Sequence, residues 1–134
     1  MGWKRKLAYT ADITALKTRF LGETKRKLTE RGLKKSSATV LPIGSVIVCT
    51  RATIGECAIN TVEMTTNQGF KTIILKDDFD SDFIYYSIVL NKPELIRLST
   101  GSTFGEVPKT AFEKLKIDTP PLFEQRKIAE ILST

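Results

Sequence analysis

The spacing of apolar residues changes partway along the chain, from strand-like to helical. In ATVLPIGSVIVCT (residues 38–50) the unbroken apolar run VIVC predicts a strand over residues 45–50 that is buried on both faces, after a short strand and a turn at residues 42–44. In DSDFIYYSIVLNKPELIRLSTG (residues 80–101) the apolar residues instead recur at helical intervals. A chain with strands first and helices after them is typical of the α+β class.

Three further stretches predict strands, at residues 7–13, at residues 57–60 (CAIN) and at residues 70–75 (FKTIIL). Residues 14–32, TALKTRFLGETKRKLTERG, are mixed, polar and interrupted by glycine, so we expect a loop there with at most a helical turn. The expected core is therefore a small mixed or antiparallel β-sheet.

The second half predicts short helices packed on that sheet. Ser81 or Asp82 is placed to cap the first helix, and Pro93 is placed to open a second helix that ends near Gly101. The stretch PKTAFEKLKIDTPP predicts one helical turn and then a short strand over residues 115–117.

The last segment, PPLFEQRKIAEILST (residues 120–134), predicts a helix that opens at a proline, because the N–H that proline lacks is unpaired at a helix start anyway. An isolated helix this short is marginal in water, so we expect it to dock on a partner as the start of a coiled-coil-type helix. Its predicted partner face is an apolar stripe formed by Leu122, Ile128, Ala129, Ile131 and Leu132.

The composition narrows the class of protein. The chain has 134 residues, the length of one domain, with 41% hydrophobic and 27% charged residues. It has no apolar run near the roughly 20 residues that cross a bilayer, and no apolar segment behind its basic start of the kind that directs secretion. We therefore expect no membrane partner and a cytoplasmic location.

Several kinds of chemistry are excluded by residue type. Histidine is absent, which excludes Ser-His-Asp and Cys-His triads and the common zinc sites. Cys49 and Cys57 lack a Cys-x-x-Cys spacing and lie among apolar residues, so we expect buried reduced thiols. We accordingly expect no cofactor and no bound metal.

Positive charge is concentrated in the first part of the chain. Residues 1–60 hold 12 Lys and Arg against 4 Asp and Glu, whereas residues 61–134 hold 9 Lys and Arg against 11 Asp and Glu. The net charge of the whole chain is +6. The basic part is a candidate surface for a polyanion, with a solvated basic face as the alternative. Its dense points include two clusters of predicted phosphate contacts, Lys25, Arg26 and Lys27 and then Lys34 and Lys35.

A series of short motifs follows an order that resembles a known family. Between residues 9 and 132 they are YTADIT, LTERGLKKSSATVLPIGSVIVCTRATIGECAI, TTNQGF, FIYYSIVL and STGSTFGEVPKTAFEKLKIDTPPLFEQRKIAEIL. This succession resembles a target recognition domain of the DNA specificity subunit of type I restriction-modification enzymes. PPLFEQRKIAEIL is the most specific part of the resemblance.

The resemblance implies a non-catalytic protein that recognises half of a split target in double-stranded DNA. In that family, methylation and cleavage belong to a methyltransferase subunit that uses S-adenosylmethionine and to an ATP-driven restriction subunit, and long helices set the spacing of the half-sites. It implies here a recognition domain over residues 1–119 and the start of a spacer helix over residues 120–134. Since family members usually have further residues before the YTADIT match, we expect a truncated product or a compact relative that pairs with a second copy or another half.

The loop TRATIGE (residues 50–56) is the first predicted DNA contact. Arg51 stands at the end of a predicted strand, where its side chain can bind guanine O6 and N7 or a phosphate. An ion pair between Arg51 and Glu56 is the alternative. Thr53 lies in the same loop and is a second predicted contact.

Two other loops carry the remaining predicted contacts. In TTNQG, Gln68 beside Asn67 matches the major-groove edge of adenine, or else hydrogen-bonds its own turn. In STGSTFGEVPK, the residues Ser102, Thr103 and Lys109 can bind a phosphate, unless the segment is a plain connector between helices.

Two other function classes stay open. A protein-interaction module, or decoy, would bind the methyltransferase subunit through the apolar C-terminal stripe without reading DNA. A metal-dependent nuclease would hold Mg²⁺ with Asp12 and Glu23 and use Lys25 to assist water, although the flanks of Glu23 are not apolar as in buried strands. Salt-sensitive DNA binding separates recognition from the module, and metal-dependent cleavage that Glu23→Ala abolishes identifies the nuclease.

Overall fold

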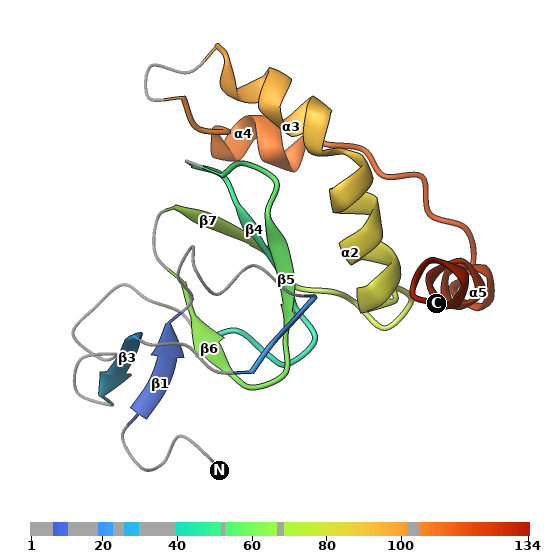
Figure 1. Cartoon of the computed structure of the whole chain (residues 1–134), viewed down its shortest axis with the longest axis horizontal. Coiled ribbons are helices and arrows are strands. Elements are labelled where there is room, and N and C mark those ends of the chain that lie inside the picture. The colour runs from blue at the N-terminus through green and yellow to red at the C-terminus, as the bar shows by residue number, and fades with distance from the viewer. Residues whose placement is uncertain are drawn as a thin grey trace.

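The computed structural model has strands at one end and helices at the other (Figure 1). It describes the backbone alone for residues 7–10 and 26–29. The residues that it describes are 7–10, 19–22, 26–29, 40–51, 53–66, 69–101 and 105–134.

Four strands form the main sheet, in the order β2-β5-β4-β7. β4 (Val46–Cys49) pairs antiparallel with β5 (Cys57–Asn60) on one side and with β7 (Phe70–Ile73) on the other. β2 (Phe20–Leu21) adds to β5 in parallel. The sheet is therefore mixed, as expected, and β7 is an edge strand within the described part of the chain.

A second sheet of three strands lies beside the first (Figure 1). Its order is β3 (Arg26–Thr29), β1 (Leu7–Thr10) and β6 (Met64–Thr65). β1 pairs antiparallel with β3 and parallel with β6. The backbone N–H of Leu41, shortly before β4, donates to Met64 O at 2.7 Å, which ties the two sheets together.

The predicted burial of VIVC is confirmed, because all four side chains of β4 are buried. Val46 and Val48 point toward the helices, and Ile47 and Cys49 point into a second cluster on the other face of the sheet. Burying an aliphatic side chain contributes roughly 1.5–3 kcal/mol, against a typical net stability of about 5–15 kcal/mol. A single truncation in β4 therefore removes a substantial fraction of the net stability.

Two of the predicted elements are wrong. The stretch expected to be a loop, residues 14–32, contains β2 and β3, and residues 115–117 lie in no strand. β2 acquires its conformation by pairing with Ile59 and Asn60, far along the chain, which its own polar surroundings do not indicate. Residues 115–117 have the alternation of a strand, but no described strand pairs with them.

The helices lie where the sequence predicts them. They are α2 (Ser81–Leu90), α3 (Lys92–Ser99), α4 (Lys109–Glu113) and α5 (Leu122–Leu132). α2 packs on β4 and β5, and α5 packs on α2 (Figure 1). Among the described residues, every helix is too short or too polar to cross a membrane.

The cap of α2 is one residue earlier than predicted. The Asp80 carboxylate accepts a hydrogen bond from Phe83 N at 3.0 Å, so Asp80, and neither Ser81 nor Asp82, is the N-cap. Ser81 has another role, because its Oγ donates to Gly44 O at 2.6 Å and joins α2 to the predicted turn before β4.

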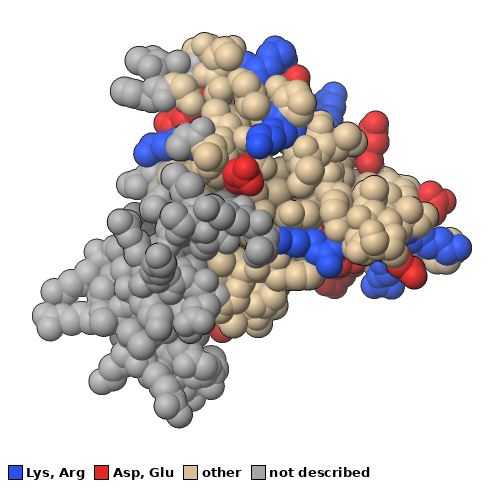
Figure 2. All heavy atoms as spheres, in the orientation of Figure 1, with Lys and Arg blue, Asp and Glu red and all other residues tan. Residues whose placement is uncertain are grey.

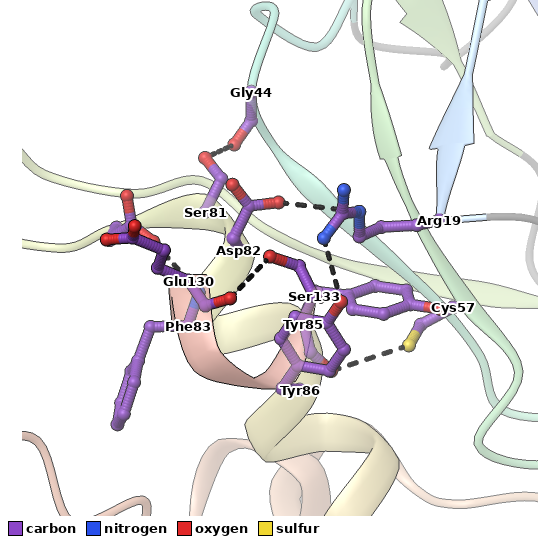
Figure 3. Close-up of polar contacts among 11 residues, drawn as sticks. Arg19, Gly44, Cys57, Ser81, Asp82, Phe83, Tyr85, Tyr86, Glu130 and Ser133 are labelled. Carbon is purple, nitrogen blue, oxygen red and sulfur yellow. Dashed lines mark hydrogen bonds and ion pairs between the residues drawn. The ribbon is translucent and has the colours of Figure 1, made fainter. Parts of the chain in front are cut away.

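Arg19 joins β2 to α2 across the sheet (Figure 3). Its Nη1 donates to the Tyr86 hydroxyl at 2.7 Å, and its Nε lies 3.7 Å from Asp82 Oδ1. Its guanidinium also lies 4.6 Å from the centre of the Phe20 ring, within the range of a cation–π contact. The contacts with Tyr86 and Asp82 link two segments that are far apart in the sequence.

Both cysteines are free and buried, as predicted. Burial raises the pKa of the Cys57 thiol to about 12, with a smaller increase from the charge of Glu56 and an opposing effect from Lys92. Its Sγ lies 3.9 Å from Tyr85 O, which is the acceptor of a weak hydrogen bond (Figure 3). Cys57 is therefore a structural thiol.

Gln125 is the residue that fastens α5 to the rest of the molecule. Its side chain is 1% exposed, and Oε1 accepts a hydrogen bond from Asp80 N at 2.9 Å. Its Nε2 donates to Asp78 O at 3.1 Å and to Pro120 O at 2.9 Å. One amide thus joins the start of α5 to the turn that caps α2.

We predict that Gln125→Leu lowers the free energy of unfolding by about 2–4 kcal/mol, because it leaves a buried N–H and two carbonyls without their partner. Urea unfolding followed by circular dichroism measures this. Glu124→Leu, at the exposed neighbouring position, is the matched control and should change stability by less than about 0.5 kcal/mol. Equal unfolding midpoints for the two variants would show that the three hydrogen bonds contribute little.

Candidate functional site

Three loops meet at the end of β4. β5 and β7 both run antiparallel to β4, so the chain enters them at the edge of the sheet where β4 ends. Thr50, which is buried, follows β4 there. Its N–H donates to Gly69 O at 2.9 Å, and its carbonyl accepts from Val107 N at 3.0 Å. The hairpin between β4 and β5, the turn before β7 and the segment before α4 are thus joined at one residue.

Arg51 carries the positive charge of this edge. Its side chain is 50% exposed, and Nε donates to Glu106 Oε2 at 2.6 Å. The hydrogen bond and the charge of Glu106 raise the pKa of Arg51, and the same contact lowers the pKa of Glu106. The alternative pair of Arg51 with Glu56 is wrong, because Glu56 lies 3.5 Å from Lys92 instead.

The hairpin that carries Arg51 is held by its own backbone. Gly55 N donates to Cys49 O at 3.0 Å, and Cys49 Sγ donates to Arg51 O at 2.8 Å. Gly55 has φ of +93°, and an added Cβ would lie 2.6 Å from Lys92 Cγ. The hairpin therefore packs closely on the start of α3, at a position where only glycine fits without strain.

We predict that Gly55→Ala destabilises the chain by about 1–3 kcal/mol, because alanine has to adopt a positive φ and displace the Lys92 side chain. Gly101→Ala is the control, since an added Cβ at Gly101 meets no atom of the described residues within 4 Å. Thermal unfolding of both variants measures the difference. Unfolding of Gly55→Ala at the wild-type temperature would mean that the hairpin rearranges freely.

Basic and acidic side chains are interspersed over the helical part of the face in Figure 2. At the site itself, Lys71 acts on Glu106 and helps to lower its pKa. Lys109, at the start of α4, lies 3.9 Å from Glu113, with both side chains exposed. Exposed pairs of this kind contribute only about 0–1 kcal/mol to stability, so they exchange readily for another anion.

The structure brings three of the predicted DNA contacts to the loops of this edge. Thr53 and Arg51 are exposed on the hairpin, and Lys109 is exposed where α4 begins, two residues after Val107. Gln68, Ser102 and Thr103 lie outside the described part of the chain. Beside Gln68, Gly69 accepts a hydrogen bond from Thr50, and Glu106, further along the loop of Ser102 and Thr103, pairs with Arg51.

The basic clusters stay predictions. Arg26 and Lys27 belong to β3, of which the backbone alone is described, and Lys25, Lys34 and Lys35 lie outside the described residues. Asn67 also lies outside them, as do Asp12 and Glu23 of the nuclease alternative.

Two residues of the site were not predicted from the sequence. Thr50 looks like the unremarkable end of a strand, and Glu106 is a single acid in a loop rich in glycine and hydroxyls. Both owe their roles to contacts across more than fifty residues, Thr50 with Val107 and Glu106 with Arg51. No local pattern carries that information.

The predicted partner face of α5 is divided in the structure. Ala129 is buried in the main core and Leu122 is half-buried, on the side that Gln125 fastens. The other predicted members are exposed, together with Phe123, which the prediction did not include. The exposed fractions are 65% for Phe123, 39% for Ile128, 72% for Ile131 and 54% for Leu132.

Comparisons with known proteins agree on one family. The protein-family model described as type I restriction modification DNA specificity domain matches residues 7–134. The MjaIX specificity subunit of Methanocaldococcus jannaschii, a type I restriction enzyme subunit, is 36% identical over 116 residues, which cover 85% of this chain and 27% of that protein. The EcoprrI specificity subunit of Escherichia coli is 32% identical over 106 residues, which cover 76% of this chain and 26% of that protein. The chain thus spans little more than a quarter of either relative.

Solved structures show the same fold. The HsdS subunit from Thermoanaerobacter tengcongensis superposes with a TM-score of 0.72 at 20% identity, over 95% of this chain and 29% of that one. A second structure, from work on complex assembly and conformational transition of the type I R-M system, superposes with a TM-score of 0.68 at 19% identity, over 98% of this chain and 36% of that one.

Proposed function

The chain belongs to the family of type I restriction modification DNA specificity domains, and from this membership we propose that it recognises half of a DNA target for a type I restriction-modification complex. The observation that carries the proposal is the convergence of three loops on Thr50, with Arg51, Thr53 and Lys109 exposed around it. Loops held by a rigid scaffold are the usual carriers of recognition.

In this proposal the domain binds DNA and catalyses nothing. Residues 1–119 form the recognition domain, and residues 120–134 begin the spacer helix. The methyltransferase subunit, and with it the restriction subunit, supplies the chemistry. A second copy, or the other half of a specificity subunit, recognises the other half-site. The names of the relatives support this assignment, since each is called a specificity subunit.

The geometry supports phosphate contacts by Arg51 and Lys109. Each side chain is exposed and lies beside a single carboxylate, Glu106 or Glu113, that a phosphate can replace. In the described part of the chain, the Glu106 carboxylate accepts from Nε of Arg51, and it holds the guanidinium at this edge until a phosphate takes its place. Phosphate contacts set the register of the protein on the duplex, so that base contacts from the same three loops fall on defined positions.

We predict that Arg51→Ala and Lys109→Ala each weaken binding to duplex DNA. Each should also reduce the slope of log Kd against log salt concentration by about 0.9, the amount expected for the loss of one phosphate contact. The wild-type slope should correspond to about five or more phosphates. Fluorescence anisotropy with a labelled random-sequence duplex over a range of salt concentrations measures both values.

Arg97→Ala is the matched control for these variants, because Arg97 is exposed on α3 and pairs with Glu94. It should leave the slope unchanged. DNA binding without salt dependence, or tight binding to a methyltransferase subunit with no DNA binding at all, would favour the interaction module.

We also predict that Ile128→Asp and Leu132→Asp weaken self-association, or docking of the spacer helix, by at least about tenfold, because a carboxylate replaces apolar contacts. Sedimentation velocity over a range of concentrations measures this. The DNA affinity of both variants should stay at the wild-type value. Arg126→Asp, on an exposed position of the same helix, is the control. A wild-type chain that neither self-associates nor binds another spacer helix would contradict the role proposed for this face.

A further inference from the structure

An apolar groove runs beside β7, the last strand of the main sheet. Its volume is about 610 Å³. One wall is formed by six consecutive residues, 71–76, from β7 and the chain that continues it. The other walls come from α4 and from alternate residues of the connection to α5, Leu115, Ile117 and Thr119.

The backbone of β7 turns toward β4 and away from it at alternate residues. Thr50 N donates to Gly69 O, and the register pairs Val48 with Lys71. Because hydrogen-bonded positions alternate in an antiparallel pair, Lys71 and Ile73 turn their N–H and C=O toward β4. Thr72, between them, turns its backbone groups outward. No strand in the described part of the chain pairs with that outer edge.

The floor of the groove is continuous with the main core. Its apolar residues are partly buried and pack against the buried cluster beneath them, whereas Ile74, directly after β7, is 57% exposed. An open strand edge beside an apolar surface favours pairing with another extended chain. The apolar residues that line the groove and pack on the core are Ile73, Leu75, Phe79, Phe112, Leu115 and Ile117.

The charge around the groove is mainly positive. Lys71, Lys76 and Lys109 line it, and Glu113 is the one acid among the lining residues, 3.9 Å from Lys109. A ligand with carboxylates is therefore complementary to this rim, and a basic one is repelled.

We propose that the groove binds an extended, acidic segment of a partner protein, which adds a strand to the outer edge of β7. Apolar side chains of that segment would enter the groove at every second position, and its carboxylates would meet the lysines of the rim. The six residues of the wall span about 20 Å, enough to pair with a segment of similar length. This surface is distinct from the loops around Thr50, although Lys71 and Lys109 border both.

The proposal is tested with a synthetic peptide of alternating valine and glutamate, roughly eight residues long, and the full chain labelled with ¹⁵N. We expect saturable shifts of the amide signals of residues 70–76, and binding that is weakened at least about tenfold by N-methylation of the peptide at alternate positions. A peptide with lysine in place of glutamate should not bind. Failure of the valine–glutamate peptide to shift these signals overturns the proposal.

Variants of the chain supply the second arm. Thr72→Pro removes the outward N–H, at an edge position where a strand tolerates proline, and should weaken binding at least about tenfold, whereas Thr72→Val keeps the N–H and should bind as wild type. Lys76→Glu should weaken binding, with Lys116→Glu as the control outside the groove. Circular dichroism verifies that each variant is folded. Equal peptide affinity of Thr72→Pro and Thr72→Val overturns the proposal, as does a Lys76→Glu variant that loses affinity for DNA and keeps it for the peptide.

Discussion

Burial of β4 on both faces is the constraint on which the rest of the structure depends. Val46 and Val48 lie under the helices, Ile47 and Cys49 lie in the opposite cluster, and the backbone alternates its hydrogen bonds between β5 and β7. A strand enclosed in every direction cannot shift by one residue without turning its apolar side chains to the wrong face. Its end is therefore fixed in space, and the three loops that meet at Thr50 take their positions from it.

Buried amides fix what apolar packing leaves free. Asn60 is fully buried, and its Oδ1 accepts from Ser45 N at 2.8 Å while its Nδ2 donates to Pro42 O and Val62 O. Gln125 does the same for α5. Apolar contacts tolerate sliding and rotation, but a buried amide with three partners is satisfied in one arrangement only, and leaving its partners unpaired costs about 1–3 kcal/mol for each group. Asn60 thus fixes the register of the β4–β5 hairpin, and Gln125 fixes the position of α5.

The division between scaffold and surface suits a domain that presents a DNA-reading edge. Stability comes from the buried strand and the amides, while Arg51, Thr53 and Lys109 stand on exposed positions where substitution leaves the core untouched. The exposed face of α5, with Ile131 and Leu132, turns away from the side that Gln125 fastens. In the proposed function, DNA contact and partner contact can therefore change independently of each other.

The sequence by itself determined the class of the fold, because the period of its apolar residues is a local property. It predicted β4, β5, β7 and the helices, the buried thiols and the family, and it selected the three loops that the structure joins at Thr50. Only the tertiary structure decided how they are joined, since the pair of Arg51 with Glu106 and the pairing of β2 with β5 each link residues distant in the sequence. It also decided which side of α5 is buried. The apolar pattern indicated one stripe through Leu122 and Ile128, and the polar Gln125, satisfied by three hydrogen bonds, turned the helix so that much of that stripe faces solvent.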